Sequence, residues 1–383
     1  MLITLPAVAQ GFNDQFDRGV ITNDPTGRKN WTWFTGDGQA TMTLSQENGL
    51  GVVQVDATHD QRGIWWALIK RSISAQIDVR ELARADRELH IEARVRSRTA
   101  PRRVNLSVNH TRTTDFHHNL AEFDLPDTGW HTIAFTTRGF DARQGDEVFA
   151  QMALVDWGLD RFQVDIDWFK VTVVDPRRAP PDQGEPLPYR PPIAAAASFS
   201  NTVLATADAT LDTAYPSVNF SGWVNMTTGA KEPLLATSGS QLIVLRFDLS
   251  AWRGRAPDGW GVLELTTESV ARAPTDLEEF GYLRAAEILG GAPIWRRDTV
   301  TLDSFLAGRP RAAVLGQMFM DTPPAEARGA KTRIHVSPPV MRRLLSGEAK
   351  GIAIYAQGAV NASFFSTRAS QPVNRPVLRF NVK

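Results

Sequence analysis

A group of histidines offers the clearest candidate chemistry in this sequence. Six of the seven histidines lie before residue 175, and His110, His117 and His118 fall within residues 109–119. A histidine that titrates near neutral pH can take the C5 proton of a uronic acid while a cation or an amide stabilises the developing enolate. His110, His117 and Lys70 are therefore candidate catalytic groups of a polysaccharide lyase. The alternative is that His117 and His118 lie in a solvated loop.

Alternation along three expected strands, 64–70, 89–96 and 103–110, gives a second set of candidates. Apolar side chains occupy every second position, and polar side chains occupy most of the positions between them. If these strands pair as in a jelly roll, the polar positions form one concave surface that can bind hydroxyl, carboxylate or sulfate groups. This predicted ligand surface contains Trp66, Lys70, Arg94, Arg96, Asn105 and Asn109.

Tryptophans are further ligand candidates, because sugar-binding surfaces present Trp rings to pyranose rings. We expect Trp31 and Trp33 to contribute to such a surface together with Trp66. Since successive side chains on a strand point to opposite faces, one of the adjacent Trp65 and Trp66 must face the core. Two others that we expect in the interior are Trp130 and Trp168.

The composition excludes several classes of protein. The 383 residues include 42 basic and 42 acidic side chains and no cysteine, so the net charge favours neither nucleic acid nor an acidic membrane surface. Disulfides and Cys-ligated zinc are excluded. The sequence contains no phosphate-binding glycine-rich loop, no His-Glu-x-x-His helix and no Gly-x-Ser-x-Gly elbow. Nucleotide-dependent enzymes are therefore not expected.

The start of the chain bears on localisation. Residues 1–10 are apolar and end in Ala-Val-Ala before a polar segment, which is typical of the remnant of a signal peptide. A disordered tail is the alternative. No later run approaches the ~20 apolar residues of a membrane span. We therefore expect an exported protein that is secreted, periplasmic or at the cell surface.

A proline-rich segment predicts two modules. Seven of the 23 prolines fall within residues 176–192, so residues 175–197 are expected to form an extended linker that joins no sheet. On both sides of it, short runs with period-2 alternation predict strands. The expected fold is all-β, with two jelly-roll-like β-sandwich modules at residues 11–174 and 198–383. A helix is expected at residues 338–346.

Residues 12–174 resemble the galactose-binding-like jelly rolls found among carbohydrate-binding modules. The resemblance rests on the acidic opening at residues 13–17, on Trp31 and Trp33, and on the acidic closing strand at residues 164–171. It implies that the first and last strands are neighbours and hold a structural calcium ion (Ca²⁺), with Asp17 and Asp167 as ligands. The alternative is that these carboxylates lie in water at sheet edges.

Residues 198–383 resemble the DNRLRE domain, whose family includes carbohydrate-binding module family 96. Three blocks in order carry the resemblance: residues 207–222, the strand at 245–249, and residues 365–370 with 374–380. It implies a β-sandwich associated with polysaccharides, including alginate. A charged insertion at residues 274–291 departs from the family pattern and is expected to lengthen a loop.

Three functions remain open at this point. The first is an exported polysaccharide-binding protein, for an anionic uronic-acid polymer or a plant or algal polysaccharide. The second is a lyase that cleaves a uronate polymer by β-elimination in the first module. Jelly-roll lyases commonly use a tyrosine, however, and all four tyrosines lie at or beyond residue 189. The third is a cell-surface structural or adhesive protein. The sequence does not determine the oligomeric state.

Overall fold

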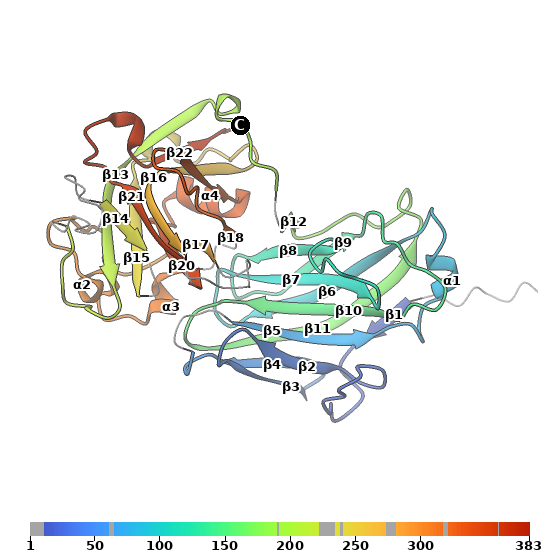
Figure 1. The fold of residues 1–383 in the computed structure, drawn as a ribbon. Helices are drawn as coiled ribbons and strands as arrows, with labels where there is room; N and C mark the ends of the chain where they lie inside the picture. Colours follow the sequence, from blue (N-terminus) through green and yellow to red (C-terminus); the bar gives the residue numbers. More distant parts are fainter. Residues whose placement is uncertain are drawn as a thin grey trace, which may run out of the picture. The chain divides into compact units, whose positions relative to one another are not determined.

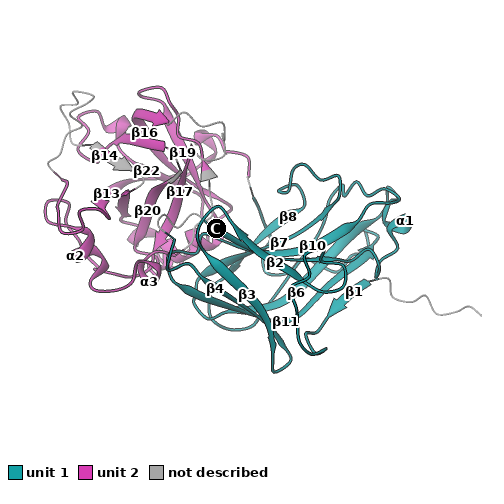
Figure 2. Ribbon diagram, turned by 60° about the horizontal axis from the view of Figure 1, so that its bottom comes forward, with its two compact units in different colours: residues 1–189 teal, residues 190–383 magenta. Residues whose placement is uncertain are grey.

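The chain folds into two units. The computed structural model describes residues 11–60, 65–189, 191–221, 234–237, 240–272, 281–316, 321–358 and 360–383. Unit 1 spans residues 1–189 and unit 2 spans residues 190–383 (Figure 2). Every pairing between described strands is antiparallel, which confirms the all-β prediction. The predicted signal-peptide remnant at residues 1–10 lies outside the described residues.

Two six-stranded sheets make up unit 1 (Figure 1). The first sheet has the order β3-β4-β11-β6-β9, and β1 pairs with the second half of β11. Its strands are β1 (Gly11–Asp14), β3 (Thr41–Glu47), β4 (Leu50–Asp56), β6 (Glu88–Ser97), β9 (His131–Thr136) and β11 (Arg161–Val174). The second sheet has the order β12-β8-β7-β10-β5-β2. Its strands are β2 (Thr32–Gly36), β5 (Trp66–Ser72), β7 (Arg102–His110), β8 (Leu120–Leu125), β10 (Val148–Val155) and β12 (Leu187–Pro188).

Apolar side chains from both sheets form the core of unit 1, as the alternation predicted. On β6 the buried set is Ile91, Ala93 and Val95, and on β7 it is Val104, Leu106 and Val108. Each of these side chains is at most 2% exposed. Because only one face of each strand is apolar, a shift of register by one residue would expose the whole set.

The linker prediction is wrong for part of residues 175–197. Leu187 and Pro188 form β12 and pair with Glu122 and Ala121 of β8. Gln183 exchanges backbone hydrogen bonds with Ala134. Proline lacks only its own N–H, so the residues between prolines still donate, and an edge strand tolerates the gap. Unit 1 therefore extends to residue 189 rather than ending at residue 174.

Unit 2 contains one sheet of ten strands. Its order is β14-β21-β16-β22-β13-β15-β20-β17-β18, and β19 also pairs with β16. The strands are β13 (Asn201–Asp212), β14 (Leu234–Thr237), β15 (Gln241–Phe247), β16 (Gly261–Arg272), β17 (Gly281–Ile288), β18 (Asp321–Thr322), β19 (Lys331–Val336), β20 (Gly351–Gly358), β21 (Val360–Phe365) and β22 (Val377–Phe380). β13 pairs with β22 up to Leu204 and with β15 from Ala205 onward, and a bulge lies between Ala205 and Ala207 in the second pairing.

Helices contribute little to either unit. The α-helices are α1 (Val79–Leu82), α2 (Leu302–Leu306), α3 (Arg311–Val314) and α4 (Pro338–Ser346), and the 3₁₀ turns are η1 (Ala196–Ser198), η2 (Ser250–Trp252) and η4 (Pro372–Asn374). The predicted helix at 338–346 is confirmed as α4, which contributes Met341 and Leu344 to the main core of unit 2. In the described part of the chain no helix is long and apolar enough to cross a membrane.

The charged segment 274–291 is not only a lengthened loop. Residues 281–288 form β17, which pairs with β20 and β18, while residues 274–280 lie outside the described residues. Glu287 of β17 is fully buried and accepts two hydrogen bonds from Arg343 of α4, at 2.8 and 2.9 Å. The charge of Glu287, which argued for a loop in the sequence, is compensated inside the fold by a bidentate ion pair.

Candidate functional site

The second sheet of unit 1 turns one face away from the first sheet, and we call it the polar face. Directly paired residues share a face of the sheet, so the register defines rows across it. One row consists of Phe34, Leu68, Ala153, Asn105, Glu122 and Leu187. The next consists of Thr32, Lys70, Gln151, Ser107 and Leu120. The flanking rows add Trp66 on one side and Phe149 with Asn109 on the other.

An aromatic pair lies at the β2 edge of the polar face. The rings of Phe34 and Trp66 meet edge to face, with centroids 5.5 Å apart. Phe34 is 41% exposed. Gly36 makes room for the indole, because a Cβ at Gly36 would lie 2.1 Å from Trp66 Cζ2. The prediction that one of Trp65 and Trp66 faces the core is confirmed, since Trp65 is fully buried and Trp66 is half-buried.

Amide and hydroxyl side chains occupy the middle of the polar face. They are Asn105, Ser107, Asn109 and Gln151, and each is less than 9% exposed because neighbouring side chains surround it. None of the four side chains makes a hydrogen bond to another residue in the described ranges. Their polar atoms are not sealed from solvent either. Their capacity to donate and accept is therefore available to a ligand.

Lys70 supplies a positive charge between the aromatic pair and the amides. Its Nζ lies 4.0 Å from the centroid of the Phe149 ring, and burial lowers the pKa of Lys70 while the carboxylate of Glu147 opposes that shift. Glu147 itself is engaged by Arg28 and Ser72. Lys70 takes part in no ion pair with any residue that the structure describes. The geometry thus leaves its ammonium available to an anion.

Arg94 and Arg96 do not belong to the polar face, which corrects the sequence prediction. Their strand, β6, pairs with β11 and β9 in the first sheet, whereas Asn105 and Asn109 lie on β7 in the second. Arg94 donates to Asp167 at 2.6 Å, and Arg96 donates to Asp165 at 2.7 Å. The alternating pattern correctly predicted which side chains of each strand point outward. The pairing of the strands, however, places the arginines of β6 and the asparagines of β7 on different sheets.

Two tryptophans predicted as ligand contacts also lie elsewhere. Trp31 is 1% exposed, stacks on Phe16 and donates from Nε1 to Asp14 at 2.9 Å. Trp33 is half-buried and points to the opposite side of β2 from Phe34. Phe34 takes the place that the sequence analysis gave to Trp33, and applying the one-in, one-out rule to this pair would have identified it.

The prediction that Trp130 and Trp168 pack in the interior is wrong as well. Both are half-buried rather than buried. The guanidinium groups of Arg94 and Arg96 lie over the Trp130 ring, at 5.2 and 4.5 Å from its centroid. A cation over an indole face covers apolar area at a partly exposed site, so these rings help to close the outward face of the first sheet.

The three candidate catalytic residues are not brought together. Lys70 lies on the polar face of β5, whereas His110 alternates with Asn109 and packs edge-on against Phe140 instead, with ring centroids 5.3 Å apart. Burial lowers the pKa of His110, and its Nδ1 accepts a hydrogen bond from the backbone of Arg112. His117 lies in the loop between β7 and β8. At ~4.8 Å per strand, β5 and β8 are about 14 Å apart.

A tyrosine nevertheless belongs to unit 1. The pairing of β12 with β8 brings Tyr189 against His117, and the two rings stack with centroids 3.9 Å apart and an angle of 14° between their planes. His117 Nδ1 lies 3.4 Å from Asp115. Tyr189 falls within the predicted linker, so its contact with His117 was not predicted. The stack lies beside the β8 end of the polar face.

The predicted calcium ligands do not fit a calcium site as they are placed. Asp167 accepts a hydrogen bond from Arg94, and Asp17 lies beyond β1 with a side chain that is 65% exposed. Calcium needs six to eight oxygen ligands. Among the described residues, no group of three or more His, Asp or Glu side chains could hold a metal ion. The guanidinium of Arg94 already neutralises Asp167.

Comparisons with known proteins return similar structures but no relatives in sequence. No family model and no curated protein matches the chain. The resemblance of unit 2 to the DNRLRE domain therefore stays a prediction.

Several similar solved structures are carbohydrate-binding modules. A CBM4 structure has 16% identity, covers 42% of this chain and 97% of its own length, and has a TM-score of 0.29. The family 11 module of Clostridium thermocellum, in complex with a β-1,3-1,4-mixed-linked tetrasaccharide, is 12% identical. The match covers 40% of this chain and 94% of the module, with a TM-score of 0.25. The tandem CBM22 domains of Paenibacillus barcinonensis Xyn10C are 12% identical. The match covers 99% of this chain and 98% of that chain, with a TM-score of 0.27. Scores this low do not establish a shared ligand.

Proposed function

We propose that unit 1 binds a polysaccharide along the polar face. The observation that carries the proposal is the set of four polar side chains, Asn105, Ser107, Asn109 and Gln151, whose hydrogen-bonding groups make no bond to described residues. These groups lie in register with the aromatic pair of Phe34, which is exposed, and Trp66, which is half-buried, on the same sheet face.

The chemistry of this face matches a chain of sugar units. A pyranose ring has an apolar C–H face that packs on aromatic rings, and Phe34 with Trp66 offers such a surface. Its hydroxyl groups both donate and accept, as do the side chains of Asn105 and Gln151. The sheet is six strands wide, so the face extends for about 24 Å at ~4.8 Å per strand. A polymer fits this length better than a single sugar.

Charge on the face defines the preferred polymer. With Arg94 and Arg96 on the other sheet, the cations of the polar face are Lys70 and Arg103, and Arg103 is 3.4 Å from Glu122 inside a buried pair. We therefore propose a polymer that carries occasional carboxylates, of uronic-acid, plant or algal type, with one carboxylate at Lys70. Such polymers lie outside cells, so the proposal includes export of the protein.

A binding panel tests this function. Affinity electrophoresis of the full chain in gels with neutral glucans or with uronic-acid polymers should show retardation by at least one polymer. Trp66→Ala should clearly reduce this retardation, and Trp130→Ala, on the outward face of the first sheet, should leave it unchanged. Retardation that survives both Trp66→Ala and Phe34→Ala would remove the polar face from consideration.

The same samples test the lyase alternative, which the stacked pair of His117 and Tyr189 keeps open. Absorbance of unsaturated uronate should stay flat if unit 1 only binds. A rising signal that His117→Ala abolishes would make unit 1 a lyase and replace the binding proposal.

A further inference from the structure

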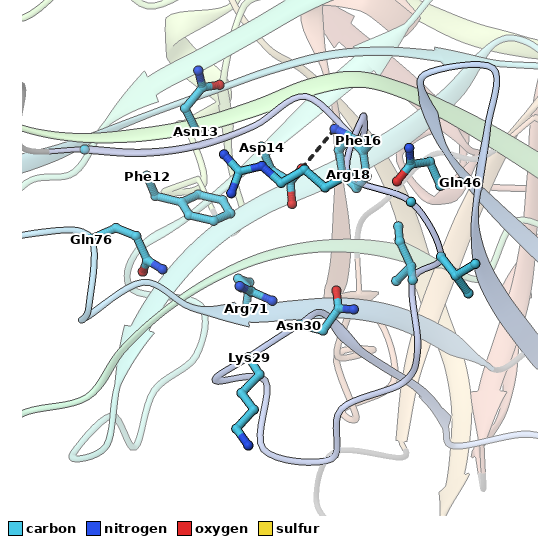
Figure 3. Close-up of a pocket in the computed structure, with 14 residues that line it drawn as sticks. Phe12, Asn13, Asp14, Phe16, Arg18, Lys29, Asn30, Gln46, Arg71 and Gln76 are labelled. Atoms are coloured by element: carbon cyan, nitrogen blue, oxygen red, sulfur yellow. Dashed lines mark hydrogen bonds between the residues drawn. The ribbon is translucent and has the colours of Figure 1, made fainter.

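A pocket of about 450 Å³ lies in unit 1, lined by residues that the polar face does not use. Its walls come from β1, from the segment between β1 and β2, and from the end of β5 (Figure 3). The volume falls within the ~300–1,000 Å³ of typical small-molecule sites. The strands β1 and β5 belong to different sheets, so the pocket opens at one end of the sandwich.

Arg71 is the unusual residue of this pocket. It follows Lys70 on β5 and points to the other side of the strand, the side on which Ala67 and Ile69 are buried. Its Nε is buried without a hydrogen-bond partner, and Arg71 takes part in no ion pair with any residue in the described parts of the chain. Burying a donor of a charged group without a partner is costly. A bound anion would remove that cost.

The charges that line the pocket favour an anion. Arg18 and Arg71 contribute two positive charges, and Asp14 contributes the one negative charge among the lining residues. The Asp14 carboxylate is already engaged, because one oxygen accepts from the backbone of Phe16 and the other from the Trp31 indole, both at 2.9 Å. Figure 3 shows Arg18 and Arg71 on opposite sides of the pocket. The Lys29 ammonium points away from it.

Neutral side chains in the pocket indicate more than a bare ion. Asn30, Gln46 and Gln76 line it with amide groups, whereas the side chain of Asn13 points away from it (Figure 3). Asn30 uses its oxygen to accept from the backbone of Trp31, which leaves its NH₂ group. The amides of Gln46 and Gln76 make no side-chain hydrogen bond to described residues. Amides on several sides of a cationic centre suit a ligand that carries hydroxyl groups around a carboxylate.

We propose that this pocket binds a carboxylate-bearing sugar unit, with the carboxylate on Arg71 and the hydroxyls on the surrounding amides. The site is separate from the polar face, because Lys70 and Arg71 point to opposite sides of β5. The proposal does not depend on polysaccharide binding by the polar face.

Calorimetry of the full chain with glucuronate, glucose and acetate tests the proposal. Glucuronate should bind, and Arg71→Gln should weaken it by about tenfold or more, since a charge-assisted bidentate contact is lost. Glucose and acetate should each bind at least about tenfold more weakly than glucuronate. Arg80→Gln, on the exposed surface of α1, is the matched control and should bind as the parent does. Trp66→Ala should also keep glucuronate binding, which separates this site from the polar face.

Other outcomes overturn the proposal. Equal affinity for acetate and glucuronate would mean an anion site without sugar recognition. Glucuronate binding that Arg71→Gln leaves unchanged would place the carboxylate elsewhere, and no binding at all would exclude the site. Thermal unfolding of Arg71→Met controls for folding: its melting temperature should not fall, because the Nε of the parent arginine is buried without a hydrogen-bond partner. A large fall would show that Arg71 is structural.

Discussion

The outward faces of the two sheets of unit 1 both contain polar side chains, but these side chains are paired on the first sheet and largely unpaired on the second. On the first sheet the charges are paired: Asp165 forms ion pairs with Arg96 and Arg98, and Asp167 forms one with Arg94, at distances of 2.6–2.7 Å. On the second sheet, the side chains of Asn105, Asn109 and Gln151 make no hydrogen bond to described residues. Polar side chains that pair with one another on a surface stabilise the fold. Polar side chains that have no hydrogen-bond partner within the protein can instead bind a ligand.

Breaking the paired face should have the largest effect. Asp165 is fully buried and also accepts from Gln163 at 2.6 Å. Asp165→Ala would leave Arg96 and Arg98 without their carboxylate, so the free energy of unfolding should fall by about 2–3 kcal/mol, less than for a wholly buried pair because both arginines reach solvent. Urea denaturation measures this change. Polysaccharide affinity of the folded variant should stay at the parental value, and a selective loss of affinity would assign binding to the first sheet.

Trp66→Ala should lower polysaccharide affinity and leave the stability of the fold largely unchanged. Removal of the indole takes away the stacking surface for a sugar ring, so affinity should fall by about tenfold, or ~1–2 kcal/mol. Isothermal titration calorimetry measures this affinity, with the polymer that retards the protein in the gel as the ligand. Trp130→Ala is the matched control on the first sheet. If both variants lose affinity equally, the distinction between the two faces fails.

Truncating the unpaired amides should have a smaller effect. Asn105→Ala and Asn109→Ala should each weaken polysaccharide binding by about fivefold, or ~1 kcal/mol. Neither should lower the melting temperature much, since neither amide bonds to another described residue. Differential scanning calorimetry measures the melting temperature, and the binding titration measures the affinity, so the two effects can be separated. Destabilisation without loss of affinity would mean that the amides belong to the fold.

The smallest expected effect is the pH dependence at Lys70. Burial lowers the pKa of its ammonium, so Lys70 loses its charge at a lower pH than an exposed lysine does. Binding of a uronate polymer should weaken by about two- to fivefold as pH rises through that pKa. Binding of a neutral polymer should not change over the same range. Titrations of parent and Lys70→Gln should differ only with the uronate polymer, and an identical pH profile in both would remove Lys70 from the site.

Local patterns predicted much of each sheet but not the full set of strands. Periodicity of 2 or 3.6 residues predicted the buried sets of β6 and β7, the opposite directions of Trp65 and Trp66, and the helix Pro338–Ser346. Strands whose inward positions carry charge were missed. On β13, Asp208 is fully buried and pairs with Arg297 at 2.6 Å, which the alternation of apolar residues could not show.

Local sequence is enough to predict which side chains of a strand share a face, because successive residues of a strand point to opposite sides. Which strands are neighbours can be read only from the folded structure. Arg94 and Asn105 looked equivalent in the sequence, yet β6 and β7 belong to different sheets. The same non-local pairing brought Tyr189 to His117 and left Arg71 facing an open pocket. Partners in a sheet lie far apart along the chain, so contacts across the whole fold select them, and local sequence does not record that choice.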